Sequence, residues 1–294
     1  METLSGRNAL ITGGASGIGF AMAQALLNEG VNVAIADVDG NALARAHEAL
    51  AGSNARVMAL TLDVTDRTRF AAVADAVEAE LGNIHLFCNN AGVYRGGSLD
   101  AVTYQDWDWV LGVNLGGVVN GVQTLVGRMK AHGEGGHIVN TASMAGVAPS
   151  PGLGVYNTSK FAVVGLSEAL RLDLEPHGIG VSVLCPGMVR TGILESERTR
   201  PAALEVTDAE AKAAAEAHSN VMNLAMNAGI EASEVAELVV AGIRENQLYL
   251  FPHPELKASV ETRAETMLDA FGEASPERLA AQEAFLAELL KTAE

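Results

Sequence analysis

The chain has 294 residues, 49% of them hydrophobic, so it can bury a large core. Its 19 basic and 36 acidic residues give a formal net charge of −17, which argues against nucleic acid and anionic membranes as partners. The sequence shows no secretory signal and no apolar run approaching the ~20 residues that span a bilayer. Its two cysteines, Cys88 and Cys185, end apolar runs, so we expect a cytoplasmic protein with buried, unpaired thiols.

Short apolar runs alternate with longer segments of helical periodicity along the chain. The predicted strands are Ala9–Thr12, Val31–Ala36, Val57–Leu62, Leu86–Asn89, Ile138–Thr141, Val181–Cys185 and Leu248–Phe251. The predicted helices include Gly17–Glu29, Ala42–Leu50, Arg67–Leu81 and Val155–Glu175. Strands that are apolar on both faces and separated by helices predict an α/β fold, a doubly wound, Rossmann-like parallel sheet of seven strands in three layers. No linker or repeat divides residues 1–294, so we expect a single domain.

A glycine-rich turn, Thr12-Gly13-Gly14-Ala15-Ser16-Gly17-Ile18-Gly19, joins the first strand directly to the first helix. Glycines permit a tight turn and let a pyrophosphate approach the backbone, and the helix N-terminus offers it free N–H groups. The G-x-x-x-G-x-G spacing between a strand and a helix favours a dinucleotide site over an ordinary turn. The residues that we assign to the cofactor here are Gly13, Ser16, Gly17, Ile18 and Gly19.

Two acidic residues end the second and third predicted strands. The Asp37 carboxylate could accept hydrogen bonds from both hydroxyls of the adenine-side ribose and would repel a 2′-phosphate. Because no Lys or Arg adjoins it, we predict NAD rather than NADP. The alternative is that Asp37 only caps the turn that follows. Asp63, followed by Val64, could meet the adenine amino group or belong to a helix cap.

Further motifs follow in chain order. They are Asn89-Asn90-Ala91-Gly92 after the fourth strand, Ser143 after the fifth, Tyr156-Asn157-Thr158-Ser159-Lys160, and Pro186-Gly187 after the sixth. Each motif alone is weak, but in this order and on these elements they are specific. Together with the glycine-rich turn, they resemble the short-chain dehydrogenase/reductase superfamily over roughly residues 5–255. The resemblance implies an oxidoreductase that uses NAD(H) and forms a homodimer or homotetramer through helices around Asn114–Lys130 and Tyr156–His177.

The resemblance also implies a catalytic set of Asn114, Ser143, Tyr156 and Lys160. Tyr156 and Lys160 are four residues apart on a predicted helix and hence on one face. A free phenol has a pKa near ~10, which a nearby ammonium and the nicotinamide charge should lower, so that Tyr156 can exchange a proton while hydride moves. In the superfamily the equivalents of Lys160, Ser143 and Asn114 hold the nicotinamide ribose, the substrate oxygen and a relay water. The structural alternatives are a core tyrosine, a turn serine and an asparagine at a helix bend.

The resemblance assigns further residues to the cofactor: Asn90, Ala91, Gly92, Tyr156, Lys160, Pro186, Gly187, Val189 and Thr191. Asn89 and Asn90 are expected mainly to fix the strand-end backbone. Ligands of open α/β sheets lie beyond the carboxyl ends of the strands. The substrate residues predicted there are Tyr94, Ser143, Ala145, Pro149, Leu153, Tyr156 and Met188. Apolar side chains around this position suit an apolar or aromatic substrate, although those of the lid could serve packing alone.

The sequence therefore predicts an NAD-dependent enzyme that interconverts a secondary alcohol and a ketone. A helical lid is expected at about 190–229, and a helical extension at about 254–294 has Ser275 as an N-cap and Pro276 as a first helical residue. We expect no metal, because the histidines lack ligand spacing, and His253 between two prolines should be a rigid turn residue. Two other functions remain open: a non-catalytic nucleotide-binding protein, and an NAD-retaining epimerase or dehydratase of the same superfamily.

Overall fold

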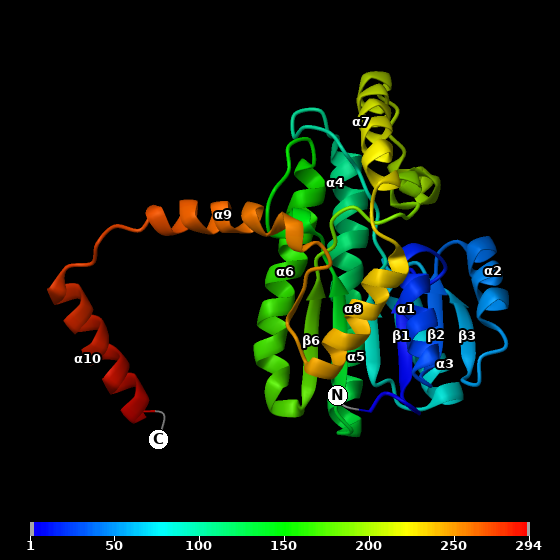
Figure 1. Ribbon diagram of the computed structural model, residues 1–294, viewed down its shortest axis with the longest axis horizontal. Coiled ribbons are helices and arrows are strands. Elements are labelled where there is room, and N and C mark those ends of the chain that lie inside the picture. The colour runs from blue at the N-terminus through cyan, green and yellow to red at the C-terminus, as the bar shows by residue number, and fades with distance from the viewer. Residues whose placement is uncertain (1–2, 293–294) are drawn as a thin grey trace. The chain divides into compact units, whose positions relative to one another are not determined.

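Seven parallel strands form the central sheet, in the order β3-β2-β1-β4-β5-β6-β7 (Figure 1). Their bounds are β1 Asn8–Thr12, β2 Asn32–Asp37, β3 Val57–Thr61, β4 Leu86–Asn89, β5 Gly136–Thr141, β6 Ile179–Leu184 and β7 Tyr249–Leu250. The computed structural model describes residues 3–292, without the side chains of Ala211, Ala214, His218, Val221, Leu289, Leu290 and Thr292. The predicted doubly wound sheet is confirmed, with strand ends within two residues of those expected.

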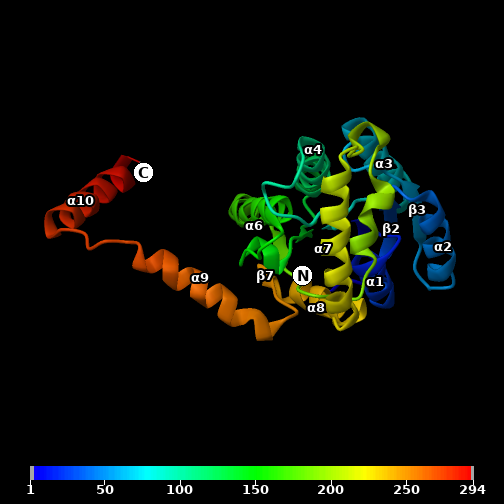
Figure 2. The same cartoon turned by 90° about the horizontal axis from the view of Figure 1, so that it is seen from above.

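Helices cover both faces of the sheet, which makes the three predicted layers (Figure 2). The helices of one face are α1 Gly17–Asn28, α2 Gly40–Leu50 and α8 Ala232–Glu245, and those of the other are α3 Arg67–Leu81, α5 Val118–His132 and α6 Gly154–Leu174. Because both faces are covered, strands such as β1 are buried along their whole length. Each fully buried side chain of the size of Leu26 or Phe70 contributes roughly 1.5–3 kcal/mol to folding.

One long helical stretch lies against the sheet. It consists of α4 Tyr104–Leu111, a π-helical turn η1 Gly112–Gly117 and α5. Over Tyr104–His132 this stretch is long and apolar enough to cross a membrane by length and composition, which the sequence analysis did not anticipate. Core packing accounts for part of this apolar character, since 39% of the apolar window is buried and Leu125 and Met129 of α5 belong to the buried cluster beneath it. Length and apolar composition alone do not distinguish a core helix from a membrane helix.

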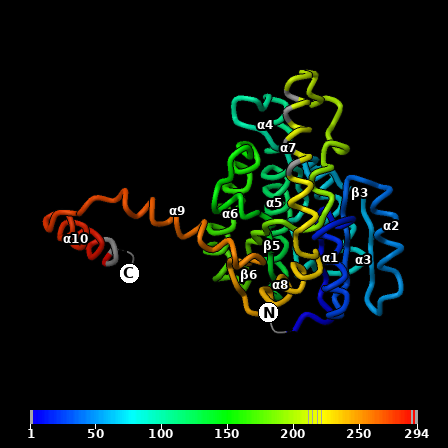
Figure 3. Tube along the Cα trace, turned by 45° about the horizontal axis from the view of Figure 1, so that its top comes forward, coloured from blue at the N-terminus to red at the C-terminus, as the bar shows by residue number. Residues whose placement is uncertain are grey.

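The chain between β6 and α8 forms the region predicted as a lid. It contains the 3₁₀ turns η4 Ile193–Thr199 and η5 Ala202–Leu204, followed by α7 Ala209–Asn227. The trace runs out from the end of β6 to α7 and returns into α8 (Figure 3). Both ends of this excursion therefore lie at the carboxyl side of the sheet, where ligands of such folds bind.

The chain divides into two compact units, Met1–Pro254 and Glu255–Glu294. The first holds the sheet and the lid. The second holds α9 Lys257–Asp269 and α10 Pro276–Thr292. As predicted, Pro276 begins α10, and the Arg278 amide donates to the Ser275 hydroxyl at 3.4 Å. That residues 1–294 form one domain stays a prediction.

Candidate active site

The strand order reverses between β1 and β4, and the glycine-rich turn lies at this switch point. Gly13 has φ +63°, and a Cβ there would lie 2.9 Å from the Ala91 Cα atom. A Cβ on Gly19 would lie 2.1 Å from the Gly13 carbonyl oxygen. Gly17, with φ +53°, lies against the Thr191 side chain, 3.1 Å from where its Cβ would be. The turn thus brings together cofactor residues that the sequence placed far apart.

Asn90 fastens the end of β4 to this turn. Its side-chain amide donates to the Thr12 carbonyl oxygen at 3.1 Å, and its Oδ1 atom accepts from the Thr141 hydroxyl at 3.1 Å. The Thr12 hydroxyl accepts from the backbone amides of Asn90 and Ala91. Asn89 donates to the Val118 carbonyl oxygen at 2.9 Å. Both asparagines therefore fix backbone, as the sequence analysis expected.

Asp37 lies half-buried at the mouth of the glycine-rich turn. One carboxylate oxygen accepts from the Ala15 amide at 3.2 Å and the other from the Asp39 amide at 3.0 Å. The helix cap is Asp39, whose carboxylate accepts from two amides of the first turn of α2. Asp37 is thus held next to the turn without being the cap residue.

The Asp63 side chain is exposed and bound locally. It accepts from the backbone amide of Thr65 at 2.9 Å and from its hydroxyl at 2.8 Å, while Asp66 caps α3. Val64 is buried, and its carbonyl oxygen accepts from the Asn120 side chain at 2.9 Å. These contacts give both residues a structural role at the end of β3.

Four side chains of the predicted catalytic set meet at the carboxyl ends of β4, β5 and β6. Tyr156 and Lys160 lie on α6, with the Lys160 Nζ atom 5.6 Å from the centre of the Tyr156 ring. Ser143, at the end of β5, is hydrogen-bonded to Tyr156, and its Oγ atom also accepts from the Ala145 amide at 3.1 Å. Lys160 is almost fully buried and donates to the Thr141 carbonyl oxygen at 2.9 Å.

Asn114 lies in the π-helical turn and is fully buried. Its Oδ1 atom accepts from the Val93 amide at 2.8 Å, and its Nδ2 atom donates to the Val93 carbonyl oxygen at 3.0 Å and to the Ser159 hydroxyl at 3.1 Å. The side chain therefore holds the segment after β4. A Cβ on Gly92 would lie 3.4 Å from the Asn114 Oδ1 atom and 3.5 Å from the Lys160 Nζ atom, so these groups converge on one glycine.

Burial dominates the ionisation of this site. It raises the pKa of Tyr156 to about 12, although the hydrogen bond with Ser143 acts in the opposite direction. It also lowers the pKa of Lys160 to about 8. The lowering of the Tyr156 pKa expected from Lys160 is therefore not found in the protein alone, because loss of water disfavours the phenolate more than the hydrogen bond with Ser143 stabilises it.

The predicted substrate side is apolar. Tyr94, Ala145 and Leu153 form a buried cluster, against which Ile193, Leu194 and Met222 of the lid pack. The rings of Tyr94 and Tyr156 lie 5.3 Å apart between centroids. Met188 is half-buried at the start of the lid, whereas Pro149 is exposed and does not belong to the cluster.

A buried ion cluster that the sequence motifs do not reveal lies beside this surface. Asp106 is fully buried on α4 and accepts from the Arg95 Nε atom at 2.8 Å and from the Arg200 Nη2 atom at 2.6 Å. The Arg200 guanidinium lies over the Trp109 ring, 4.2 Å from its centre. Arg200 and Asp106 are 94 residues apart, and no motif links them. The one sequence pattern that points to Asp106 is Thr103-x-x-Asp106, which forms a capping box at the start of α4.

Gly19→Ala should weaken nucleotide binding strongly. Its Cβ would meet the backbone of Gly13 at 2.1 Å, and backbone cannot move aside cheaply. We expect the Kd for NADH, measured by fluorescence titration, to rise at least about a hundredfold, since the loss of two charge-assisted hydrogen bonds of about 1.5–3 kcal/mol each from the turn to the pyrophosphate is worth that factor. Gly40→Ala is the control, because Gly40 begins α2 and nothing lies within 4 Å of its Cβ position. Unchanged NADH affinity in Gly19→Ala would contradict the assignment of the turn.

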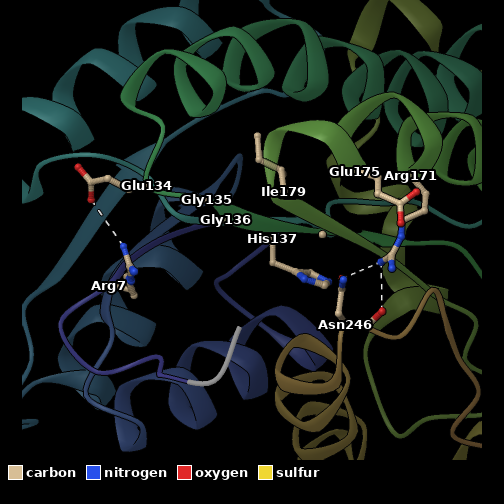
Figure 4. Close-up of a pocket in the computed structure, with 11 residues that line it drawn as sticks. Arg7, Glu134, Gly135, Gly136, His137, Arg171, Glu175, Ile179 and Asn246 are labelled. Atoms are coloured by element: carbon tan, nitrogen blue, oxygen red, sulfur yellow. Dashed lines mark hydrogen bonds and ion pairs between the residues drawn. The ribbon is translucent and has the colours of Figure 1, made fainter.

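A separate hollow of about 240 Å³ lies at the opposite, amino-terminal edge of β5 and β6 (Figure 4). Arg7 and Glu134 form an ion pair on one side of it, and Arg171 donates to the Asn246 Oδ1 atom at 2.7 Å on the other. None of the residues assigned above to cofactor or substrate lines it. Within residues 3–292, no group of three or more His, Cys, Asp or Glu side chains is arranged to hold a metal ion.

Known proteins are similar to this chain in sequence and in fold. Residues 7–202 match the family model of the short chain dehydrogenases. The C alpha-dehydrogenase of Sphingobium sp. (strain NBRC 103272 / SYK-6) is 37% identical over 282 residues, covering 94% of this chain and 91% of that protein. A short-chain dehydrogenase/reductase from Burkholderia phymatum, solved in complex with NAD, is 39% identical with a TM-score of 0.88, covering 94% of this chain and 99% of that one.

A short-chain dehydrogenase from Burkholderia cenocepacia J2315, solved in complex with NADP, is 31% identical with a TM-score of 0.69, covering 85% of this chain and 97% of that one. The family match extends over the glycine-rich turn, β4, β5 and the Tyr156–Lys160 pair. The resemblance inferred from the motifs is thereby confirmed. The chain is an oxidoreductase that belongs to the short-chain dehydrogenase/reductase superfamily.

Proposed function

We propose that this protein is an NAD-dependent oxidoreductase that interconverts a secondary alcohol and a ketone. The observation that carries the proposal is the convergence of Tyr156, Ser143 and Lys160. Hydrogen bonds through Thr141 and Asn90 link this group to the start of the glycine-rich turn at Thr12. A protein that only bound a nucleotide would have no use for a half-buried phenol that is hydrogen-bonded to a serine and lies next to an ammonium. These are the groups that proton exchange with a substrate oxygen needs.

The residues present fit NAD. Gly13, Gly17 and Gly19 leave a cradle that side chains would fill, and α1 begins there with its free amides. Asp37 is held at the mouth of the turn, where its carboxylate can accept from ribose hydroxyls and repel a 2′-phosphate. The solved complex of the relative from Burkholderia phymatum with NAD supports this choice.

Side chains of the protein would transfer the proton to or from the substrate oxygen. NAD supplies the acceptor or donor of hydride when bound. In ketone reduction, the neutral Tyr156 phenol donates its proton to the substrate oxygen, and burial already favours this neutral form. In alcohol oxidation, Tyr156 must be the phenolate that accepts the hydroxyl proton, and positive charge nearby favours it. Ser143 donates to the substrate oxygen and orients it.

We also propose an apolar, aromatic substrate. The buried cluster of Tyr94, Ala145 and Leu153 lies directly beside Tyr156, and the lid adds Ile193, Leu194 and Met222. Apolar walls with a few converging polar groups are typical of small-molecule sites. The relative named C alpha-dehydrogenase supports dehydrogenation at a carbon atom as the reaction class.

A panel of secondary alcohols and ketones, aromatic and aliphatic, assayed with both nucleotides tests the proposal. We expect oxidation of aromatic secondary alcohols with NAD⁺, followed by NADH absorbance, at a kcat/KM well above that with NADP⁺. Faster turnover with NADP⁺ would contradict the cofactor assignment. Absence of turnover across the panel in both directions would contradict the activity.

Asp37→Ser should weaken the preference for NAD. Loss of charge-assisted hydrogen bonds of about 1.5–3 kcal/mol predicts a fall of about 10–100-fold in kcat/KM for NAD⁺. The kcat/KM for NADP⁺ should not fall with it, because the repelling charge is gone. Asp173→Asn, at an exposed position of α6, removes the same charge and serves as the control. An unchanged ratio of the two kcat/KM values in Asp37→Ser would refute the role of this carboxylate.

A further inference from the structure

Backbone hydrogen bonds join the two ends of the lid. We call this junction, residues 187–190 and 229–230, the lid root. Val189 and Ile230 form an isolated parallel bridge. The Ile230 amide donates to the Met188 carbonyl oxygen at 3.1 Å, and the Arg190 amide donates to the Ile230 carbonyl oxygen at 2.9 Å. The backbones approach so closely that a Cβ on Gly229 would lie 2.4 Å from the Met188 carbonyl oxygen.

The side chain of His253, near the C-terminal end of the first unit's sequence, also contacts the lid root. It follows β7 and is 5% exposed. Its Nδ1 atom accepts from the Gly187 amide at 3.0 Å, and its Nε2 atom lies 3.0 Å from the Met188 carbonyl oxygen. Since a backbone amide can only donate and a carbonyl oxygen can only accept, the ring must be neutral with its proton on Nε2. His253 is therefore more than the rigid turn residue predicted from its two flanking prolines, because both ring nitrogens contact the chain after β6.

Met188 is thus the common acceptor of two donors. Its carbonyl oxygen receives the Ile230 amide from the returning end of the lid and the His253 ring from the last strand. Pro252 and Pro254 restrict the backbone on both sides of the histidine, so the ring is presented from a stiff segment. A rigid strand end is in this way connected to the point where the lid begins.

The residues held by His253 adjoin the reacting groups. The Pro186 carbonyl oxygen, one residue before Gly187, accepts from the Ser143 hydroxyl at 3.3 Å and from the Met144 amide at 2.9 Å. Thr191, three residues after Met188, lies against Gly17 of the glycine-rich turn. A shift at Gly187 and Met188 would therefore move both the serine side and the nucleotide side of the site.

We propose that His253 is a positioning residue, which fixes the Gly187–Met188 backbone and thereby the lid root for binding of nucleotide and substrate. Its kinetic consequence rests on the proposed dehydrogenase function. It acts through the backbone and touches no reacting atom. Loss of both hydrogen bonds loosens the root, so binding suffers more than the proton transfer at Tyr156.

The test uses three variants. His253→Phe keeps a ring but loses both hydrogen bonds, His253→Asn offers an acceptor near the Nδ1 position, and His253→Gln offers a donor near the Nε2 position. His47→Phe is the control, because His47 is exposed on α2. In the nucleotide-free protein, we expect hydrogen–deuterium exchange of the Gly187 and Ile230 amides to be about tenfold faster in His253→Phe, which corresponds to one lost buried hydrogen bond. His253→Asn should restore slow exchange at Gly187.

Kinetics give a second readout. We expect His253→Phe to raise the Kd for NADH and the KM for the alcohol about tenfold, with kcat within about threefold of the parent. A merely structural role would lower the midpoint of thermal unfolding and the active fraction without this split between KM and kcat. If His253→Phe does not fold, the Asn and Gln variants carry the same comparison.

Two results separate this proposal from the proposed function. Unchanged exchange at Gly187 and Ile230 in the folded variants would overturn the role of His253, whatever the enzyme's activity. If the parent protein turns over no alcohol or ketone, the proposed function fails. Faster exchange at the two amides in the His253 variants would still establish His253 as the positioning residue of the lid root.

Discussion

Tyr156→Phe is expected to lower kcat by about a thousandfold, because general acid–base catalysis contributes roughly 10²–10⁴-fold and neither Ser143 nor Lys160 can replace the phenol. Ser143 is hydrogen-bonded to the Tyr156 hydroxyl but is a poor acid, and Lys160 is directed to the Thr141 carbonyl oxygen. The substitution removes one oxygen atom from a half-buried ring, so the fold and the affinity for NADH should change little.

The pH profile distinguishes proton transfer from substrate positioning. Because burial raises the pKa of Tyr156 to about 12, the phenolate required for alcohol oxidation is the minor form at neutral pH. Bound NAD⁺ adds positive charge and lowers this pKa, but below it the oxidation rate should still rise about tenfold per pH unit. Ketone reduction, which needs the neutral phenol, should not rise in this way. Tyr156→Phe should abolish the dependence.

Tyr94→Phe is the matched control for this experiment. The Tyr94 ring is buried and its centroid lies 5.3 Å from that of Tyr156, so Tyr94→Phe removes a hydroxyl from the immediate neighbourhood of Tyr156. We expect kcat to stay within about tenfold of the parent, because the hydroxyl does not exchange the proton. If Tyr156→Phe retained more than a tenth of the parent kcat, or if Tyr94→Phe lost as much as Tyr156→Phe, the assignment of the proton donor would be wrong.

The sequence was sufficient where one local rule decided the outcome. Apolar runs of four to six residues predicted the strands of a sheet that is covered on both faces, and all seven are present. Glycine spacing predicted the turn, whose close backbone contacts leave no space for a Cβ at Gly13 or Gly19. Tyr156 and Lys160 share a helix face because they are four residues apart.

The sequence was insufficient where a residue's role depended on contacts with distant segments of the chain. The histidine of a Pro-His-Pro sequence suggests a rigid turn, and only the fold shows that its ring reaches Gly187 and Met188. The ionisation of Tyr156 depended on burial, which a motif does not report. The sequence around Asp106 indicates only a capping box, and the ion pair of Asp106 with Arg200 is visible only in the fold.

Asp106→Asn is expected to destabilise the protein by about 3–5 kcal/mol, because it leaves two buried guanidinium groups without the carboxylate they share. Asp106 is fully buried, and the side chains of Arg95 and Arg200 are 4% and 5% exposed, so water cannot replace the lost charge. Since Arg200 lies between the η4 and η5 turns and bonds the Leu204 carbonyl oxygen at 3.1 Å, the first part of the lid should loosen as well. Denaturant unfolding measures the free energy, and proteolysis between residues 193 and 204 measures the loosening.

The control and the pH dependence make this prediction specific. Asp108→Asn, on the exposed face of the same helix, should change the unfolding free energy by no more than about 0.5 kcal/mol. Burial alone would raise the pKa of Asp106, but hydrogen bonds from Arg95, Thr103 and Arg200 outweigh it and place the pKa below the usual 3.8. The carboxylate therefore stabilises the fold above this value, and its contribution is lost as the pH falls through the lower pKa of the folded state. The difference between parent and Asp106→Asn should accordingly be constant near neutral pH and shrink below about pH 4. A difference that persists undiminished in acid would show that shape, rather than charge, makes Asp106 indispensable.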